Sequence, residues 1–270
     1  MKGSPSTWFE TCIERLADPQ HQRVWSVIVS LFGDLARQPG NRLSGAALGR
    51  IIGPVGIRPE AIRVAVHRLR KDGWLESQRS GRESQHFLSA FGREQSAAVS
   101  PRIYSRTPES GMDWHLIIAE EASGVHILDD LLLTESHVSI GRNVAIGAGP
   151  APTDSGELLV FSTTPVSVPG WFRDKVCPPD LNRACQQLAA DLAAVRALLG
   201  PERDPSPLQV ATLRTLIVHR WRRVALRYPD LPTAFFPADW PGEACREQVF
   251  ALLERLPRPT LSAIEGECAG

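Results

Sequence analysis

Six basic side chains crowd one short stretch of the chain: Arg58, Arg63, His67, Arg68, Arg70 and Lys71. Arg63, His67 and Arg70 stand four and three positions apart, so a helix places them on one face. Arginine forks bond to guanine edges and to phosphates in duplex DNA. The spacing therefore indicates a nucleic-acid-binding helix, and a solvated or ion-paired helix face is the alternative interpretation.

A second basic cluster follows in a predicted hairpin. Residues 74–78 and 85–88 have the composition of two short strands, joined by Arg79-Ser80-Gly81-Arg82-Glu83. Gly81 supplies a turn conformation that other residues resist. Arg79 and Arg82 at such a tip can reach a neighbouring DNA backbone or minor groove. The expected partner is therefore double-stranded DNA.

The spacing of apolar residues predicts the elements that position these side chains. Residues 21–37 form an amphipathic helix, and Ser44 caps a second helix that ends at Ile52. The basic helix spans residues 58–72, with Pro59 in its first turn, Gly73 as its stop and a buried stripe of Ile62, Ala65, Val66 and Leu69. Two helices, a basic helix and a hairpin follow the order of a winged helix-turn-helix.

Charge is distributed unevenly along a neutral chain. The 270 residues contain 30 Lys plus Arg and 30 Asp plus Glu. Residues 1–106 carry 16 basic and nine acidic side chains, whereas residues 107–160 carry one basic and nine acidic. A basic end joined to an acidic middle suggests that the basic end meets a polyanion.

Composition excludes several classes of protein. No apolar run reaches the roughly 18 residues that a membrane span needs, and the first residues lack the order of a signal peptide. The five cysteines show no CxxC spacing, which favours reduced thiols over a disulfide framework or a zinc site. We therefore expect a cytoplasmic protein without a membrane partner.

Enzymatic chemistry has weak support in the sequence. Asp113, Asp129 and Asp130 are the candidate metal ligands, but adjacent carboxylates near a helix start are usually capping or solvated groups. The glycine-rich residues 141–149 lack the spacing of a phosphate-binding loop. We expect no catalytic residue, metal or cofactor. A metal-dependent nuclease acting through the middle of the chain and a winged-helix protein-interaction subunit remain the alternatives.

The rest of the chain divides into two further segments. Residues 96–101 have the composition of a linker, and the short apolar runs from 102 to 165 predict a small α+β domain. Amphipathic helices are expected over residues 178–199, 205–227 and 243–256. The expected organisation is α+β with domains at 1–95, 96–170 and 171–270, the last one helical.

Several motifs together resemble one bacterial family. They are residues 29–34, Gly56-Ile57, residues 61–69, Asp72-Gly-Trp-Leu75 and residues 79–82, followed by Arg102-Ile-Tyr104 with Trp114, then residues 226–232 and 237–242. In this order they resemble the PaaX family of repressors of phenylacetate-degradation genes. The resemblance spans about residues 21–260.

The resemblance implies a homodimeric repressor of a catabolic operon, which an aromatic acyl-CoA such as phenylacetyl-CoA releases from its operator. It implies recognition-helix arginines at Arg63 and Arg68, wing arginines at Arg79 and Arg82, and a ferredoxin-like middle domain. His86 stands where the family usually has tyrosine in the second strand of the wing.

An acyl-CoA effector would need cations and aromatic surfaces. We expect the outer face of the helix at 205–227 to carry Arg214, Arg220, Arg222, Arg223 and Arg227. Arginine binds phosphates through paired N–H donors. The candidate effector-binding residues are Arg220, Arg223, Arg227, Trp171, Trp221 and Trp240. The alternative is that these arginines pair with acids at an interface.

Overall fold

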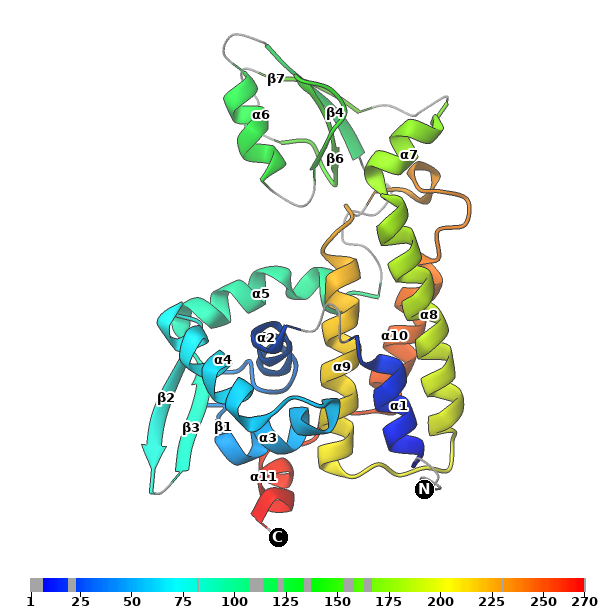
Figure 1. The fold of residues 1–270 in the computed structure, drawn as a ribbon. Helices are drawn as coiled ribbons and strands as arrows, with labels where there is room; N and C mark the ends of the chain where they lie inside the picture. Colours follow the sequence, from blue (N-terminus) through cyan, green and yellow to red (C-terminus); the bar gives the residue numbers. More distant parts are fainter. Residues whose placement is uncertain are drawn as a thin grey trace. The chain divides into compact units, whose positions relative to one another are not determined.

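The computed structural model describes residues 7–18, 23–81, 83–106, 114–120, 124–133, 137–152, 158–162, 167–229 and 231–269. These residues form helices and two antiparallel sheets, joined by turns and irregular segments, which confirms the α+β class (Figure 1). The chain divides into two compact units. Unit 1 comprises Met1–Ser100, Leu188–Arg222 and Ala244–Gly270, and unit 2 comprises Pro101–Gln187 and Arg223–Glu243.

The basic segment lies in unit 1 among short, closely connected elements. They are α1 (Trp8–Leu16), α2 (Val24–Leu35), β1 (Leu43–Ser44), α3 (Gly45–Ile52), the 3-10 turn η1 (Gly53–Val55), α4 (Pro59–Lys71), β2 (Leu75–Ser80) and β3 (Glu83–Leu88). The strands form an antiparallel sheet in the order β1-β3-β2. The three helices and the hairpin therefore lie where the apolar spacing predicts them.

Local sequence explains both ends of α4. Pro59 occupies the first helical position, where its missing N–H costs nothing. At the other end Gly73 has φ 78°, its N–H bonds to the Arg70 carbonyl at 3.1 Å, and Trp74 N–H bonds to the Leu69 carbonyl at 2.8 Å. This pair of bonds is a Schellman motif, which ends the helix at a left-handed glycine.

The hairpin after α4 has a shorter turn than the sequence predicts. Ser80 pairs directly with Glu83, and Gly81 has φ 62°. The prediction that Arg79 belongs to the turn is wrong, because Arg79 lies in β2 opposite Ser84. The strand pairing extends as far as Ser80 and Glu83, because Gly81 readily adopts the left-handed conformation that a tight hairpin turn needs.

The predicted linker at 96–101 is helical. Helix α5 (Ala90–Tyr104) runs through it and contains Pro101. Ser96 is buried, and Ser100 Oγ donates to its carbonyl at 2.6 Å. Small polar residues suggested a linker, but a serine side chain that bonds back to the helix backbone is compatible with a helix.

The C-terminal part of the chain is helical, with α8 (Pro179–Leu199), α9 (Pro207–Ala225), α10 (Gly242–Arg255) and α11 (Leu261–Ala269). The expectation of an exposed arginine face on α9 is wrong for Arg214 and Arg220, which are 4% and 9% exposed. Each is paired with an aspartate, Arg214 with Asp34 at 2.8 Å and Arg220 with Asp191 at 2.7 Å. Removing a guanidinium charge from water costs free energy, and in each case the nearby aspartate offsets part of this cost.

The last helix completes the core around α3. Ile264 of α11 is fully buried among side chains of α2, α3 and α4. Both the N–H and the hydroxyl of Ser44 donate to the Glu265 carboxylate, each at 2.7 Å. The hydroxyl of Ser44 also accepts from Ala47 N–H at 3.0 Å and so caps α3. Residues 221 positions apart thus meet at one helix N-terminus, where a carboxylate is favourable.

We expect Ser44→Ala to lower the free energy of unfolding by about 1–2 kcal/mol, because the variant loses the cap of α3. Urea unfolding followed by circular dichroism measures the change. Ser262→Ala in α11 is the matched control, since the Ser262 side chain is exposed and its hydroxyl lies 3.1 Å from Thr260 Oγ1. Equal stability of the two variants would contradict the capping role.

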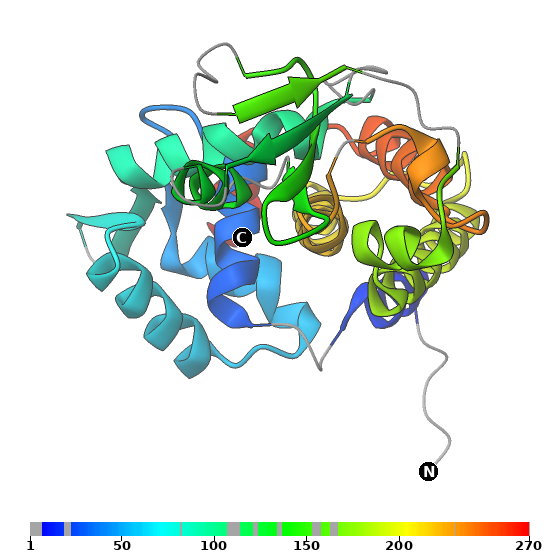
Figure 2. The ribbon, with the colours of Figure 1, turned by 90° about the horizontal axis from the view of Figure 1, so that it is seen from above.

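Unit 2 is built around a four-stranded antiparallel sheet. Its strands β4 (Trp114–Ala119), β5 (His137–Ser139), β6 (Val144–Ala148) and β7 (Leu158–Phe161) lie in the order β5-β6-β4-β7. Helix α6 (Val125–Leu132) packs along one face, with Leu128 against Ile117 and Ala145 (Figures 1 and 2). Helix α7 (Gly170–Val176) and the 3-10 turn η2 (Thr233–Phe235) also belong to this unit. Among the described helices, none is long and apolar enough to cross a bilayer.

Candidate nucleic-acid interface

The basic residues of α4 and the hairpin lie on the surface. The exposed members of the predicted set are Arg58, Arg63, His67, Arg68, Arg70, Lys71 and Arg79, and Arg82 lies outside the described residues. The predicted stripe of Ile62, Ala65, Val66 and Leu69 is buried on the opposite side. The apolar stripe turns toward the core of unit 1, so the cations of α4 must face outward.

Two arginines of α4 have acidic partners nearby in the sequence, one in the first turn of the helix and one at its C-cap. Arg63 Nη2 lies 2.8 Å from Glu60 Oε1, and the side chains are 74% and 71% exposed. Arg68 Nε lies 3.4 Å from Asp72 Oδ2, and its guanidinium lies over the Trp25 ring at 5.8 Å. Such exposed pairs contribute little to stability. A stronger anion can therefore replace the carboxylates at low cost.

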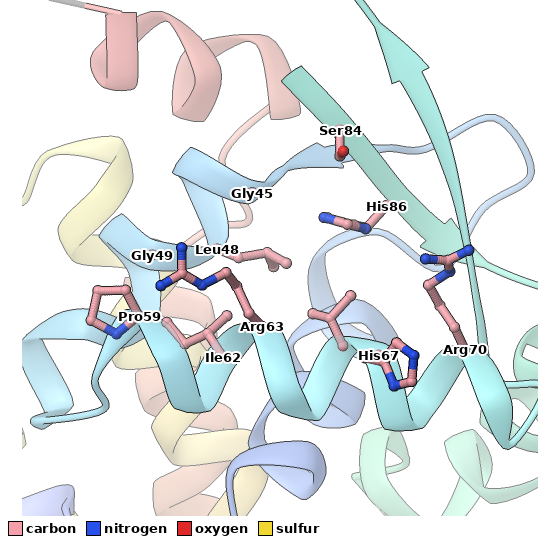
Figure 3. Close-up of a pocket in the computed structure, with 11 residues that line it drawn as sticks. Gly45, Leu48, Gly49, Pro59, Ile62, Arg63, His67, Arg70, Ser84 and His86 are labelled. Atoms are coloured by element: carbon pink, nitrogen blue, oxygen red, sulfur yellow. The ribbon is translucent and has the colours of Figure 1, made fainter. Parts of the chain in front are cut away.

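A hollow of about 460 Å³ separates α4 from α3 and β3. It is lined by Gly45, Leu48 and Gly49 of α3, by Pro59, Ile62, Arg63, Val66, His67 and Arg70 of α4, and by Ser84 and His86 of β3. Figure 3 shows Arg63 extending from α4 toward α3, and Arg70 extending toward the strands. The hollow combines an apolar floor with a rim of cationic and imidazole groups.

His86 occupies the side of this hollow that β3 forms. Its Nδ1 lies 2.7 Å from Ser77 Oγ, and a Cβ at Gly45 would lie 3.7 Å from its Nε2. Burial, followed by the nearby charge of Arg70, lowers the pKa of His86 below its ordinary value of 6.5. The imidazole is therefore mostly neutral at pH 7, and an anion in the hollow would favour its protonated form by offsetting these two effects.

A second hollow of about 560 Å³ lies between the end of α4 and β2. His67, Arg70 and Lys71 line it together with Leu75, Glu76 and Ser77. His67 and Arg70 border both hollows, so the surface is recessed on each side of them. A ridge of basic side chains between two recesses suits the sugar–phosphate backbones that border a DNA groove.

The candidate effector-binding residues fall in different surroundings. Trp221 is fully buried under the Arg246 guanidinium, and Arg220 is paired with Asp191, both in unit 1. In unit 2, Arg227 bonds to Asp180 at 2.7 Å, an interaction that lowers the pKa of this carboxyl.

The remaining three candidates also lie in unit 2. Trp171 is 58% exposed, Arg223 is half-buried, and Trp240 stacks on Phe236 with ring centroids 5.4 Å apart. Pairing with acids, the alternative interpretation of these arginines, is what the structure shows for Arg220 and Arg227.

Metal chemistry finds little support in the described part of the chain. Asp129 and Asp130 are exposed near the end of α6, and Asp113 lies outside the described residues. No group of three metal-ligating side chains occurs among the residues that the structure describes. The nuclease alternative therefore gains no site from these residues.

Sequence reasoning missed two participants in this surface. Glu60 pairs with Arg63, and its position in the first turn of the basic helix was the available signal. Ser84 lines the hollow beside His86. The available signal for this strand was His86, which stood out in the sequence only because the family usually has tyrosine there. Neither residue type is diagnostic by itself, because serines and glutamates are common on helix and strand surfaces.

Family comparisons match both ends of the chain. A model described as "PaaX-like protein" matches residues 23–92, and one described as "PaaX-like protein C-terminal domain" matches residues 179–263. The transcriptional repressor PaaX of Escherichia coli (strain K12) is 24% identical over 261 residues, which cover 88% of this chain and 82% of that protein.

A structural comparison extends the likeness to the fold. The uncharacterized protein Rv0674 from Mycobacterium tuberculosis superposes with a TM-score of 0.53 at 17% identity. The match covers 89% of this chain and 97% of that one. At this identity the likeness concerns the fold alone.

Proposed function

Because this chain belongs to the PaaX family of transcriptional regulators, we propose that it represses a catabolic operon by binding operator DNA through α4 and the β2–β3 hairpin. Family membership also makes the chain a regulator and not an enzyme. The observation that carries the proposal is the exposed cationic ridge of α4 between two hollows.

In this proposal residues 23–92 act as a winged helix-turn-helix. The order α2, β1, α3, α4, β2, β3 and the sheet order β1-β3-β2 support this assignment. Helix α4 would enter the major groove, and the hairpin with Arg79 would contact the adjacent backbone. Residues near the groove edges, Arg63 and Arg70, would hold phosphates.

The middle of the chain is proposed to be ferredoxin-like. Its strand order β5-β6-β4-β7, with α6 between β4 and β5, is the order expected of such a sheet. The proposed domains at 1–95, 96–170 and 171–270 are continuous segments of the sequence. The compact units are not continuous, because residues 188–222 and 244–270 belong to the same unit as the N-terminal elements.

Regulation would require two copies and a ligand. A homodimer places two α4 helices about 34 Å apart on a two-fold operator. In one arrangement of the dimer the spacing of the two helices fits the operator, and in another it does not. An aromatic acyl-CoA would have to bind the second arrangement more tightly, because a ligand shifts the population of two states only through a difference in affinity. Such a regulator would work in the cytoplasm, beside the chromosome.

Fluorescence anisotropy tests the DNA-binding part of the proposal. The full-length protein is titrated against a labelled duplex from the region upstream of its own gene, between 50 and 200 mM salt. We expect affinity to fall steeply with salt, because binding releases counterions from phosphates. Weak, salt-insensitive association with this duplex and with random-sequence duplexes would overturn the proposal.

A thermal-shift screen tests the ligand part. Aromatic acids and their CoA thioesters are added well above the expected dissociation constants, where a bound ligand must stabilise the fold that it prefers. A stabilising thioester should also lower the DNA anisotropy signal. Absence of both effects across the panel would reject an acyl-CoA effector and leave DNA binding intact.

His86 gives the proposed interface a pH dependence. Burial and Arg70 hold its pKa below 6.5 in the free protein. A phosphate in the hollow would offset the Arg70 charge and raise that pKa, so the complex takes up protons. DNA affinity should therefore rise as pH falls from 7.5 to 5.5, by up to about tenfold for each unit that the pKa rises.

The variant His86→Gln is expected to flatten this pH profile, as measured by anisotropy at constant ionic strength. His126→Gln is the matched control, because His126 is exposed on α6 of unit 2 and is not part of the proposed interface. A pH profile that stays steep in His86→Gln would show that His86 does not take up the proton.

A further inference from the structure

One apolar side chain stands out on the outer face of α4. Val64 is 70% exposed. Phe91, the other exposed large apolar side chain among the described residues of unit 1, packs edge-on against Trp74 with ring centroids 5.6 Å apart. Helical spacing places Val64 one turn from Glu60 on one side and from His67 and Arg68 on the other.

Stability does not explain a valine at this position. It lies about 200° around the helix axis from Ile62, so it cannot join the buried stripe. A β-branched side chain also lowers helix propensity slightly, and an exposed isopropyl group gains nothing from burial. Long polar residues would suit a merely solvated surface of a helix better.

The neighbours of Val64 indicate which kind of partner covers it. Arg63, His67, Arg68 and Lys71 surround it on the same exposed surface. An apolar protein partner would have to remove water from the charges of Arg63, Arg68 and Lys71, and the exposed pairs with Glu60 and Asp72 would offset only part of that desolvation cost. The major groove of DNA instead offers the apolar C5-methyl group of thymine between two rows of phosphates.

We propose that Val64 packs against a thymine methyl group and so selects a T·A pair at one position of the operator. This inference rests on the proposed function, since it requires α4 to lie in the major groove. The contact discriminates thymine from cytosine by apolar area alone. Val64 is therefore a specificity-determining residue, whereas its charged neighbours supply affinity that tolerates many sequences.

Selection followed by methyl deletion tests the inference. The full-length protein selects duplexes from a random pool, and each thymine of the preferred duplex is then replaced singly by deoxyuridine. We expect one replacement to weaken binding about fourfold, the effect of losing one buried methyl contact. In Val64→Ser the same replacement should have no effect, and in Val64→Ile the penalty should persist.

The outcomes separate this inference from the proposed function. Tight, salt-dependent binding that no deoxyuridine replacement weakens, or a fourfold penalty that persists in Val64→Ser, would overturn the role of Val64 and leave DNA binding standing. Failure to select any duplex would overturn both. Thermal unfolding of Val64→Ser should match that of the unsubstituted protein, because the side chain is exposed.

Discussion

Replacing Asp34 with alanine is expected to lower the free energy of unfolding by about 3–5 kcal/mol. The buried Asp34 carboxylate accepts from Arg214 Nε and Nη2, each at 2.8 Å, and from Arg258 Nε at 3.1 Å. Arg214 is 4% exposed, so the variant leaves its guanidinium charge buried without this counter-ion. Urea titration should show a lower midpoint at an unchanged slope.

Two variants separate this buried charge from ordinary side-chain loss. Combining Asp34→Ala with Arg214→Met removes both charges and should recover most of the lost stability. Glu60→Ala removes a carboxylate from a pair whose side chains are 74% and 71% exposed, so it should change stability by less than about 1 kcal/mol. If Asp34→Ala and Glu60→Ala lost equal stability, the buried ion pair would have no special role.

The double variant Arg63→Ala/Arg70→Ala is expected to weaken DNA binding on the order of 50-fold at 100 mM salt. Both arginines are exposed and line the hollow between α4, α3 and β3. If each contacts a phosphate, the double variant releases about two fewer counterions. The slope of log affinity against log salt should therefore become shallower by about 2, as anisotropy titrations would show.

A matched double variant removes the same charge elsewhere. Arg183 and Arg196 are exposed on α8, and replacing both by alanine should leave affinity and salt slope within about twofold of the unsubstituted values. The preferred sequence should not change in Arg63→Ala/Arg70→Ala, because phosphates carry no sequence information. An altered preference would instead assign one of the two arginines to a base.

The sequence by itself determined the local features of the candidate interface. Apolar residues at intervals of three and four placed Ile62 and Leu69 inward, so Arg63 and His67 had to point outward. Ser44 and Gly73 marked helix ends, because caps act within a few residues of the backbone groups that they satisfy. These features involve near neighbours along the chain and are therefore readable in one sequence.

Only the tertiary structure decided which charges are buried and which surfaces are shared. Asp34 and Arg214 are 180 positions apart, and Ser44 and Glu265 are 221 apart. The periodicity of α9 predicts that its arginines face solvent. Arg214 is nevertheless buried, because Asp34, which is distant in the sequence, lies beside it as a counter-ion. A single sequence records no such pairing, because the energy of a buried charge depends on groups that folding alone brings close.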